Sequence, residues 1–192
     1  MAYVRAVLVP IKAFSDAKGR LAPVLDASER IALSRRLAEG VLRSAGELDL
    51  FVVCDDKEVA SFAESLAATV IWTPRLGLSG AVSKGVATMA KAGVSTAVIA
   101  HGDLARPSRL AAFSSAASEV AVTLVPDRRR NGTNVICLPA GADFAFSYGP
   151  LSFAKHFAEA ARLGLGPVVV EDDELSIDID LPSDLGFLRP AS

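Results

Sequence analysis

Three aspartates in this chain could together hold a divalent cation. Asp178 and Asp180 stand two residues apart where apolar and polar side chains alternate, so in an extended chain both point to one face. Adjacent carboxylates repel each other unless a cation lies between them, and Mg²⁺ prefers oxygen ligands. Asp103, just after an apolar run at 96–100, could supply a third carboxylate. The alternative is that Asp180 only caps the helix that Pro182 begins, while Asp178 faces water.

A loop rich in cations follows the first apolar segment of the chain. Lys12, Lys18 and Arg20 come after the strand predicted over residues 4–9. In a doubly wound sheet this loop lies near the centre of the carboxyl edge, where cations suit a polyphosphate and a guanidinium can bind it through two contacts. The loop lacks the glycine spacing of a P-loop or a dinucleotide fingerprint, so alone it is more typical of a solvated surface.

Two further segments each pair a glycine with a hydroxyl. One spans 131–134 and contains Thr133, and the other spans 148–152 and contains Gly149 and Ser152. The second is expected to begin a helix, whose free N–H groups and dipole favour an anion. A plain turn and a helix cap explain both segments equally well.

Other reactive side chains are few. The two histidines, His101 and His156, are isolated and are expected to be structural. Cys54 and Cys137 each lie in an apolar run without a metal-ligand neighbour at suitable spacing, so we interpret them as buried small hydrophobic residues.

The elements that must position these residues alternate between strand and helix. The pattern βαβαβα over the first half predicts a parallel sheet with crossover helices. The run at 96–100 is typical of a strand buried on both faces, so Asp103 would lie at the carboxyl edge, where ligands bind. Residues 120–125 and 135–138 are two strands without a helix between them, which indicates an antiparallel or edge element. We expect one α/β domain over 1–192, with a mostly parallel mixed sheet and helices on both faces.

Local signals mark several element boundaries. Asp26 and Glu29 have the spacing of a capping box at a helix start, and Asp55 or Asp56 can cap the next helix. Residues 73–80 are typical of a flexible connection before a helix that begins at Ala81.

Composition excludes several classes of protein. The 192 residues carry 20 basic and 22 acidic side chains, for a net charge of -2 without a basic block, so nucleic acid is not an expected partner. Every apolar run is shorter than the ~20 residues that span a bilayer, and the amino terminus lacks the pattern of a signal peptide. We therefore expect a cytoplasmic protein without a membrane segment, either a monomer or a homodimer.

A set of short motifs stands in order along nearly the whole chain. They are Pro10-Ile11-Lys12 with residues 18–23, His101-Gly102-Asp103-Leu104, Asp127-Arg128 with Gly132-Thr133-Asn134, residues 148–150 with Ser152 and His156, and residues 178–185. Together they resemble the guanylyltransferases of coenzyme F420 biosynthesis. These are MobA-like nucleotidyltransferases with a Rossmann-like (GT-A/MobA-like) three-layer fold, and they join GMP to phosphoenolpyruvate, 2-phospho-L-lactate or 3-phospho-D-glycerate.

The resemblance implies a role for each candidate residue. Asp103, Asp178 and Asp180 would hold Mg²⁺, and Thr133, Gly149 and Ser152 would bind the phosphorylated acid. The GTP phosphates would face Lys12, Lys18 and Arg20, and the nucleotide would also contact Ser79. Catalysis would rest on Lys12, Arg20 and Asp103. Phosphoenolpyruvate ranks first as acceptor because bacterial relatives often use it.

The chain departs from the family pattern at three positions. Gly19 stands where a Ser, Thr or Lys is usual, Ala105 replaces a proline, and Ser79 replaces an asparagine in the nucleotide-contacting segment. Two alternatives therefore stay open. One is another MobA-like nucleotidyltransferase, and the other is a nucleotide-binding module without catalysis.

Overall fold

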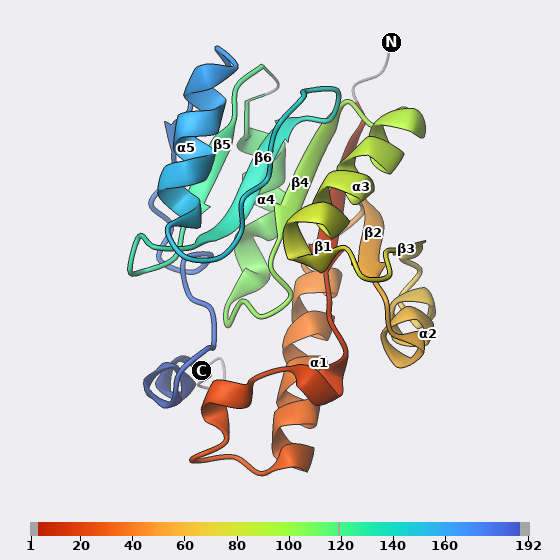
Figure 1. The fold of residues 1–192 in the computed structure, drawn as a ribbon, viewed down its shortest axis with the longest axis vertical. Coiled ribbons are helices and arrows are strands. Elements are labelled where there is room, and N and C mark those ends of the chain that lie inside the picture. The colour runs from red at the N-terminus through yellow and green to blue at the C-terminus, as the bar shows by residue number, and fades with distance from the viewer. Residues whose placement is uncertain (1–3, 119, 189–192) are drawn as a thin grey trace.

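The computed structural model describes residues 4–118 and 120–188, which form a seven-stranded sheet in the order β3-β2-β1-β4-β6-β5-β7 (Figure 1). The first three residues, on which the expected absence of a signal peptide partly rests, lie outside this range. The strands are β1 (Arg5–Pro10), β2 (Asp49–Cys54), β3 (Thr69–Trp72), β4 (Thr96–Ala100), β5 (Thr123–Pro126), β6 (Thr133–Pro139) and β7 (Val168–Val169). Strand β6 runs antiparallel to β4 and β5, and the other pairings are parallel. The predicted mixed, mostly parallel sheet is confirmed.

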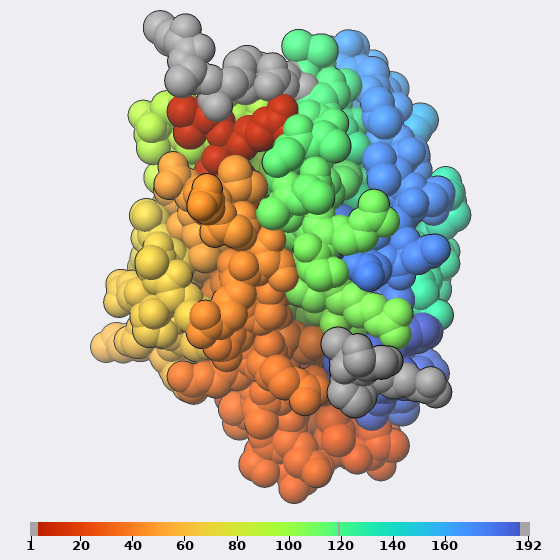
Figure 2. Space-filling model, turned by 180° about the vertical axis from the view of Figure 1, so that it is seen from behind, coloured from red at the N-terminus to blue at the C-terminus, as the bar shows by residue number. Residues whose placement is uncertain are grey.

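Helices cover both faces of this sheet. On one face lie α1 (Ala27–Arg43), α2 (Lys57–Ser65) and α4 (Leu110–Ala116), whose buried side chains pack on Val7, Val52 and Val98 of the central strands. The opposite face carries α3 (Gly77–Lys91) and α5 (Ser152–Arg162), which pack on Leu8 and Ile99. Figure 2 shows α1 and α4 side by side over the first face. The three-layer α/β architecture is therefore confirmed.

Capping side chains fix where the first two helices begin. Asp26 accepts a hydrogen bond from the Glu29 N–H at 2.9 Å, and the Glu29 carboxylate accepts one from the Asp26 N–H at 2.8 Å. This is the predicted capping box. Asp56, and not Asp55, caps α2 by accepting from the Val59 N–H at 3.0 Å. The Asp55 side chain therefore takes no part in capping α2.

Two expected element boundaries lie three or four residues from those observed, and one expected strand-like segment is hardly paired. Helix α3 begins at Gly77 and not at Ala81, and its first turn holds Gly77 and Gly80, whose low helix propensity is typical of a loop. Strand β5 begins at Thr123 and not at 120, since the Val122 N–H bonds to Leu165 O. Residues 175–180 keep the expected alternation, with buried apolar and half-buried polar side chains, but they join the segment after β4 through one isolated bridge between Leu104 and Asp178 and not through a ladder.

Close packing of α3 on the sheet requires a glycine at position 85. A Cβ there would lie 2.7 Å from Leu8 Cδ2 and 2.9 Å from Val53 Cγ1. We expect Gly85→Ala to lower the free energy of unfolding by about 1–3 kcal/mol, the usual cost of overpacking a core. Gly40→Ala, in α1, meets only Pro107 Cγ at 3.8 Å and should be neutral or stabilising, as helix propensity favours alanine. Urea denaturation checks both, and equal effects would contradict this packing.

Within the described residues, no helix is both long and apolar enough to cross a membrane.

Candidate active site

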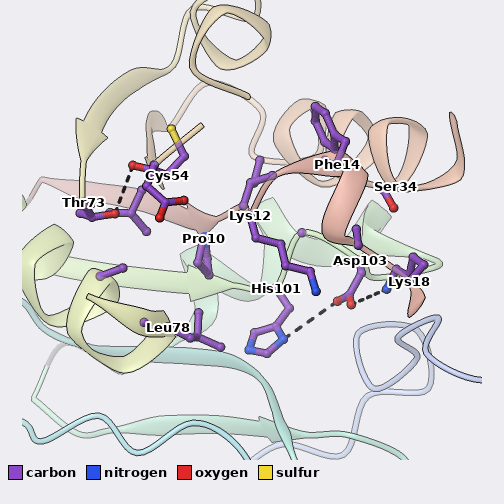
Figure 3. Close-up of a pocket in the computed structure, with 18 of the residues that line it drawn as sticks. Pro10, Lys12, Phe14, Lys18, Ser34, Cys54, Thr73, Leu78, His101 and Asp103 are labelled. Atoms are coloured by element: carbon purple, nitrogen blue, oxygen red, sulfur yellow. Dashed lines mark hydrogen bonds and ion pairs between the residues drawn. The ribbon is translucent and has the colours of Figure 1, made fainter. Parts of the chain in front are cut away.

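A cavity of about 430 Å³ opens at the carboxyl edge of the sheet (Figure 3). Its wall comes from the ends of β1, β2 and β4, the loop after β1, the first turns of α3, and Asp180. Ligand pockets of this size are typical of nucleotides and drug-sized molecules. The sheet topology thus brings the loop after β1 and the segment after β4 to the same cavity, as predicted.

Lys18 and Asp103 form the central ion pair of this cavity. The Lys18 Nζ lies 2.6 Å from Asp103 Oδ2, and the side chains are 5% and 26% exposed. Lys18 has a left-handed φ of +59° before the 3₁₀ helix Gly19–Leu21, and this conformation turns its side chain inward. Burial acts to raise the Asp103 pKa, but the Lys18 ammonium and His101 outweigh it and hold that pKa below its usual range.

The second carboxylate on this ammonium is that of Asp180. Its Oδ1 lies 3.5 Å from Lys18 Nζ, and its Oδ2 lies 3.6 Å from an Arg20 guanidinium nitrogen. The alternative role of Asp180, as a cap of the helix that Pro182 begins, is not observed. The cap is Asp184, whose Oδ2 accepts hydrogen bonds from the Asp180 and Leu181 N–H groups at 3.1 and 2.8 Å, at the start of the 3₁₀ helix Pro182–Phe187.

Asp178 lies next to these carboxylates without an ion pair to a described residue. It bridges to Leu104, and the Ile179 N–H bonds to Asp103 O at 3.2 Å. Burial and the negative charges of Asp103 and Asp180 raise the Asp178 pKa. The three predicted metal ligands therefore lie in one negatively charged region. No group of three His, Cys, Asp or Glu side chains among the described residues is arranged to hold a metal ion.

One oxygen of Asp103 has no partner in the described part of the chain. Its Oδ1 is buried without a hydrogen bond, at 4.0 Å from His101 Nδ1. A buried carboxylate oxygen without a partner costs free energy, so this position favours an added cation or donor.

Lys12 and Arg20 differ in their access to the cavity. Lys12 lines it, and Figure 3 shows its side chain directed toward His101 and Asp103. Arg20 is 74% exposed beside Asp180 and is not a lining residue among those described. His101 lines the cavity at the end of β4, where its backbone N–H bonds to Asn134 O at 3.0 Å. His101 thus helps shape the strand-end turn, as expected.

None of the three predicted acceptor-binding residues lines the cavity in the part of the chain described here. Thr133 begins β6 and Ser152 begins α5, and both are almost fully buried. Gly149 is exposed, with a φ of +109°. The N–H groups at the start of α5 are only partly free, since those of residues 151 and 153 bond to Asn131 at 3.1 and 3.3 Å.

His156 of α5 holds this region together from inside. Its Nε2 accepts from the Ser147 N–H at 2.9 Å, so its Nδ1 carries the proton and donates to Thr133 Oγ1 at 3.0 Å. Burial lowers the His156 pKa to about 4, with smaller effects of His101 and Lys155. His156 is therefore a neutral structural histidine, as expected, and it uses one acceptor position of the Thr133 hydroxyl.

Ser79 contacts the segment before α5 and is not a described lining residue of the cavity. Its Oγ accepts from the Tyr148 N–H at 3.0 Å, so it joins α3 to the segment before α5. The Tyr148 ring lies 5.2 Å from the His101 ring and 4.9 Å from the His156 ring. The sequence motifs contain Tyr148 but assigned it no role, because its position depends on contacts between distant segments.

Sequence reasoning also missed the β2 end of the cavity. Asp55, Thr73 and Leu78 line it there together with Cys54. The rule that identified Asp103, a polar residue directly after a buried strand, applies equally to Asp55. Burial raises the pKa of the Cys54 thiol and raises that of Cys137 to about 12, so both are inert buried residues, as expected.

The structure shows the surroundings of two departures from the family motifs, Ala105 and Gly19. The Ala105 N–H donates to Ile177 O at 2.8 Å, a bond that a proline could not make, and it helps fix the 177–180 segment. A Cβ on Gly19 would meet nothing within 4 Å, so a larger residue would fit there without displacing its neighbours.

Comparisons with known proteins agree with this geometry. The sequence model of the family described as "Guanylyl transferase CofC like" matches residues 5–189. A phosphoenolpyruvate guanylyltransferase of Rubrobacter xylanophilus is 34% identical over 188 residues, which cover 95% of this chain and 92% of that protein. A 2-phospho-L-lactate guanylyltransferase of Methanocaldococcus infernus is 26% identical over 181 residues, covering 93% and 82%.

The fold also matches solved structures. A nucleotidyl transferase from Methanothermobacter thermautotroptrophicus superposes with a TM-score of 0.68 at 16% identity, covering 98% of this chain and 97% of that one. The family model and the curated relatives, which span nearly the whole of this fold, define a protein of the nucleotidyltransferase class. Within that class, the chain belongs to the CofC-like guanylyl transferase family, which confirms the resemblance seen in the sequence motifs.

Proposed function

We propose that this chain transfers GMP from GTP to a small phosphorylated carboxylic acid. Phosphoenolpyruvate is the first candidate, followed by 3-phospho-D-glycerate and 2-phospho-L-lactate, and the product would enter coenzyme F420 biosynthesis. The observation that carries this proposal is the cavity at the carboxyl edge, where Lys12 and Lys18 face Asp103 and Asp180. Relatives named for phosphoenolpyruvate and for phospholactate both cover most of the chain, which supports this class of acceptor.

Mg²⁺ is the proposed cofactor, with Asp103, Asp178 and Asp180 as the residues that would hold it. The donor chemistry of these residues fits such an ion, because all three offer hard oxygen ligands and Asp103 Oδ1 is buried without a partner among the described residues. The side chains would have to rearrange around the ion, since no three of them in the described residues are arranged to hold one. When bound, the ion would neutralise charge that develops on the phosphates. Lys18 would then leave Asp103 and Asp180 to contact a phosphate group.

The proposed reaction needs no side-chain general base. An oxygen of the acceptor phosphate attacks the α-phosphorus of GTP, a new P–O–P linkage forms, and the bond to the β-phosphate breaks to release pyrophosphate. A phosphate with a second pKa of ~6 is largely dianionic at neutral pH. Lys12, Lys18 and Arg20 would align and neutralise the phosphates, so catalysis rests on positioning and electrostatics.

The test is to incubate the protein with GTP, Mg²⁺ and each of the three acids in turn, and to measure pyrophosphate. We expect release that depends on one acid and is lost with excess chelator. GTP binding without turnover on any acid would instead favour a non-catalytic module. Turnover only with a pterin or sugar phosphate would favour another nucleotidyltransferase.

A further inference from the structure

The carboxylate of Asp55 is a polar group of the cavity that the proposed chemistry does not use. Strand β2 ends at Cys54, and Asp55 follows it at the cavity wall. The neighbouring Asp56 points away and caps α2. Within residues 4–118 and 120–188, the exposed Asp55 side chain makes no hydrogen bond or ion pair. Its two oxygens are therefore available to a ligand.

The cavity has two chemically different ends. Lys18, Asp103 and Asp180 gather at the β4 end. Strand β1 lies between β4 and β2, so Asp55 leaves the sheet about 10 Å away, or two strand spacings. A phosphate group at the β4 end would place the base of the same nucleotide near β2.

The β2 end suits a flat heterocycle with hydrogen-bond donors. Leu78 and Ala81 of α3 supply apolar wall there. The Thr73 hydroxyl donates its proton to Cys54 O at 3.2 Å, so toward a ligand it can act only as an acceptor. The Asp55 carboxylate is left as an acceptor beside this apolar surface.

Guanine matches this acceptor. Its N1–H and 2-amino group are adjacent donors on one edge, whereas an ionised carboxylate offers only acceptors and can take both hydrogen bonds. Adenine presents an acceptor at N1, which a carboxylate would repel. We propose that Asp55 determines base specificity by accepting both hydrogen bonds from guanine. This inference rests on the proposed function, since it assumes that the nucleotide at this site is GTP.

The experiment compares GTP with ITP, which lacks the 2-amino group, and with ATP. Binding is measured by displacement of a fluorescent GTP analogue, and turnover by pyrophosphate release. The wild type should prefer GTP over ITP by about 10- to 100-fold, the usual effect of a hydrogen bond to a charged group. In Asp55→Asn and Asp55→Ala, we expect weaker GTP binding and a GTP:ITP ratio that falls toward one.

The matched control is Asp56→Asn, which changes the adjacent carboxylate but keeps a capping side chain. It should keep the wild-type GTP:ITP ratio, and urea denaturation should show that all the variants are folded. A wild-type ratio in both Asp55 variants, with GTP turnover intact, would overturn the role of Asp55 and leave the proposed function standing. A wild type that neither binds nor turns over GTP would overturn both.

Discussion

Asp103→Asn should reduce GTP-dependent pyrophosphate release by on the order of 10³-fold, since charge stabilisation by a bound cation supplies several kcal/mol of the barrier. The substitution keeps the shape of the side chain but removes the charge. It also replaces one carboxylate oxygen with an NH2 donor, so the charged contact with Lys18 at 2.6 Å is lost and two anionic oxygens are no longer offered to a cation. The measurement is the rate of pyrophosphate release at saturating GTP and acceptor.

The control for this variant is Asp49→Asn. Asp49 is an exposed aspartate at the start of β2, on the opposite edge of the sheet from the cavity. It should keep wild-type activity, and a urea titration should show that Asp103→Asn is still folded. Near-normal pyrophosphate release from folded Asp103→Asn would remove Asp103 from the catalytic set.

Lys18→Met should combine a large loss of activity with a loss of stability. The ammonium is 5% exposed and lies within 3.5 Å of both Asp103 and Asp180. Removing it leaves a partly buried carboxylate without its partner, which typically costs about 1–3 kcal/mol. Loss of a charged contact to a phosphate should weaken GTP binding by a further 10- to 100-fold, on the order of 1.5–3 kcal/mol. Urea denaturation and a GTP titration measure the two effects separately.

Lys12→Met separates catalytic loss from structural loss. Lys12 lines the same cavity but is exposed, and it has no ion pair with a described residue. Its removal should weaken GTP binding while the free energy of unfolding stays within about 0.5 kcal/mol of the wild type. If Lys18→Met behaved like Lys12→Met in the urea titration, the Lys18–Asp103 pair would contribute nothing to stability.

Features set by neighbouring residues were predictable from the sequence. The capping box of Asp26 and Glu29 depends on a spacing of three residues, and it forms as predicted. The position of Asp103 at the cavity followed from one buried strand and the general behaviour of parallel sheets. Both predictions needed only local pattern and a topological rule.

Features set by distant contacts were not predictable. Asp180 lies just before the 3₁₀ helix Pro182–Phe187, and Asp184 lies in its first turn, so the sequence allows either to cap it. Only the fold shows that Asp184 is the cap and that Asp180 faces Lys18. The sequence shows a free Thr133 hydroxyl, but in the fold Thr133 is buried and its hydroxyl accepts a hydrogen bond from His156 of α5. Asp55 and Asp56 are equivalent caps by spacing, and the geometry of α2 selects one of them.

The Lys18–Asp103 pair also has a consequence for folding. Its partners stand 85 residues apart in the chain, and Asp180 joins them from the segment after β7. Contacts of such sequence separation form late, because the loop between them must first be ordered. The cation–carboxylate set therefore does not exist until β1, β4 and the 175–187 segment have come together. A chain still emerging from the ribosome carries the cations of the site long before it carries the carboxylates that hold them.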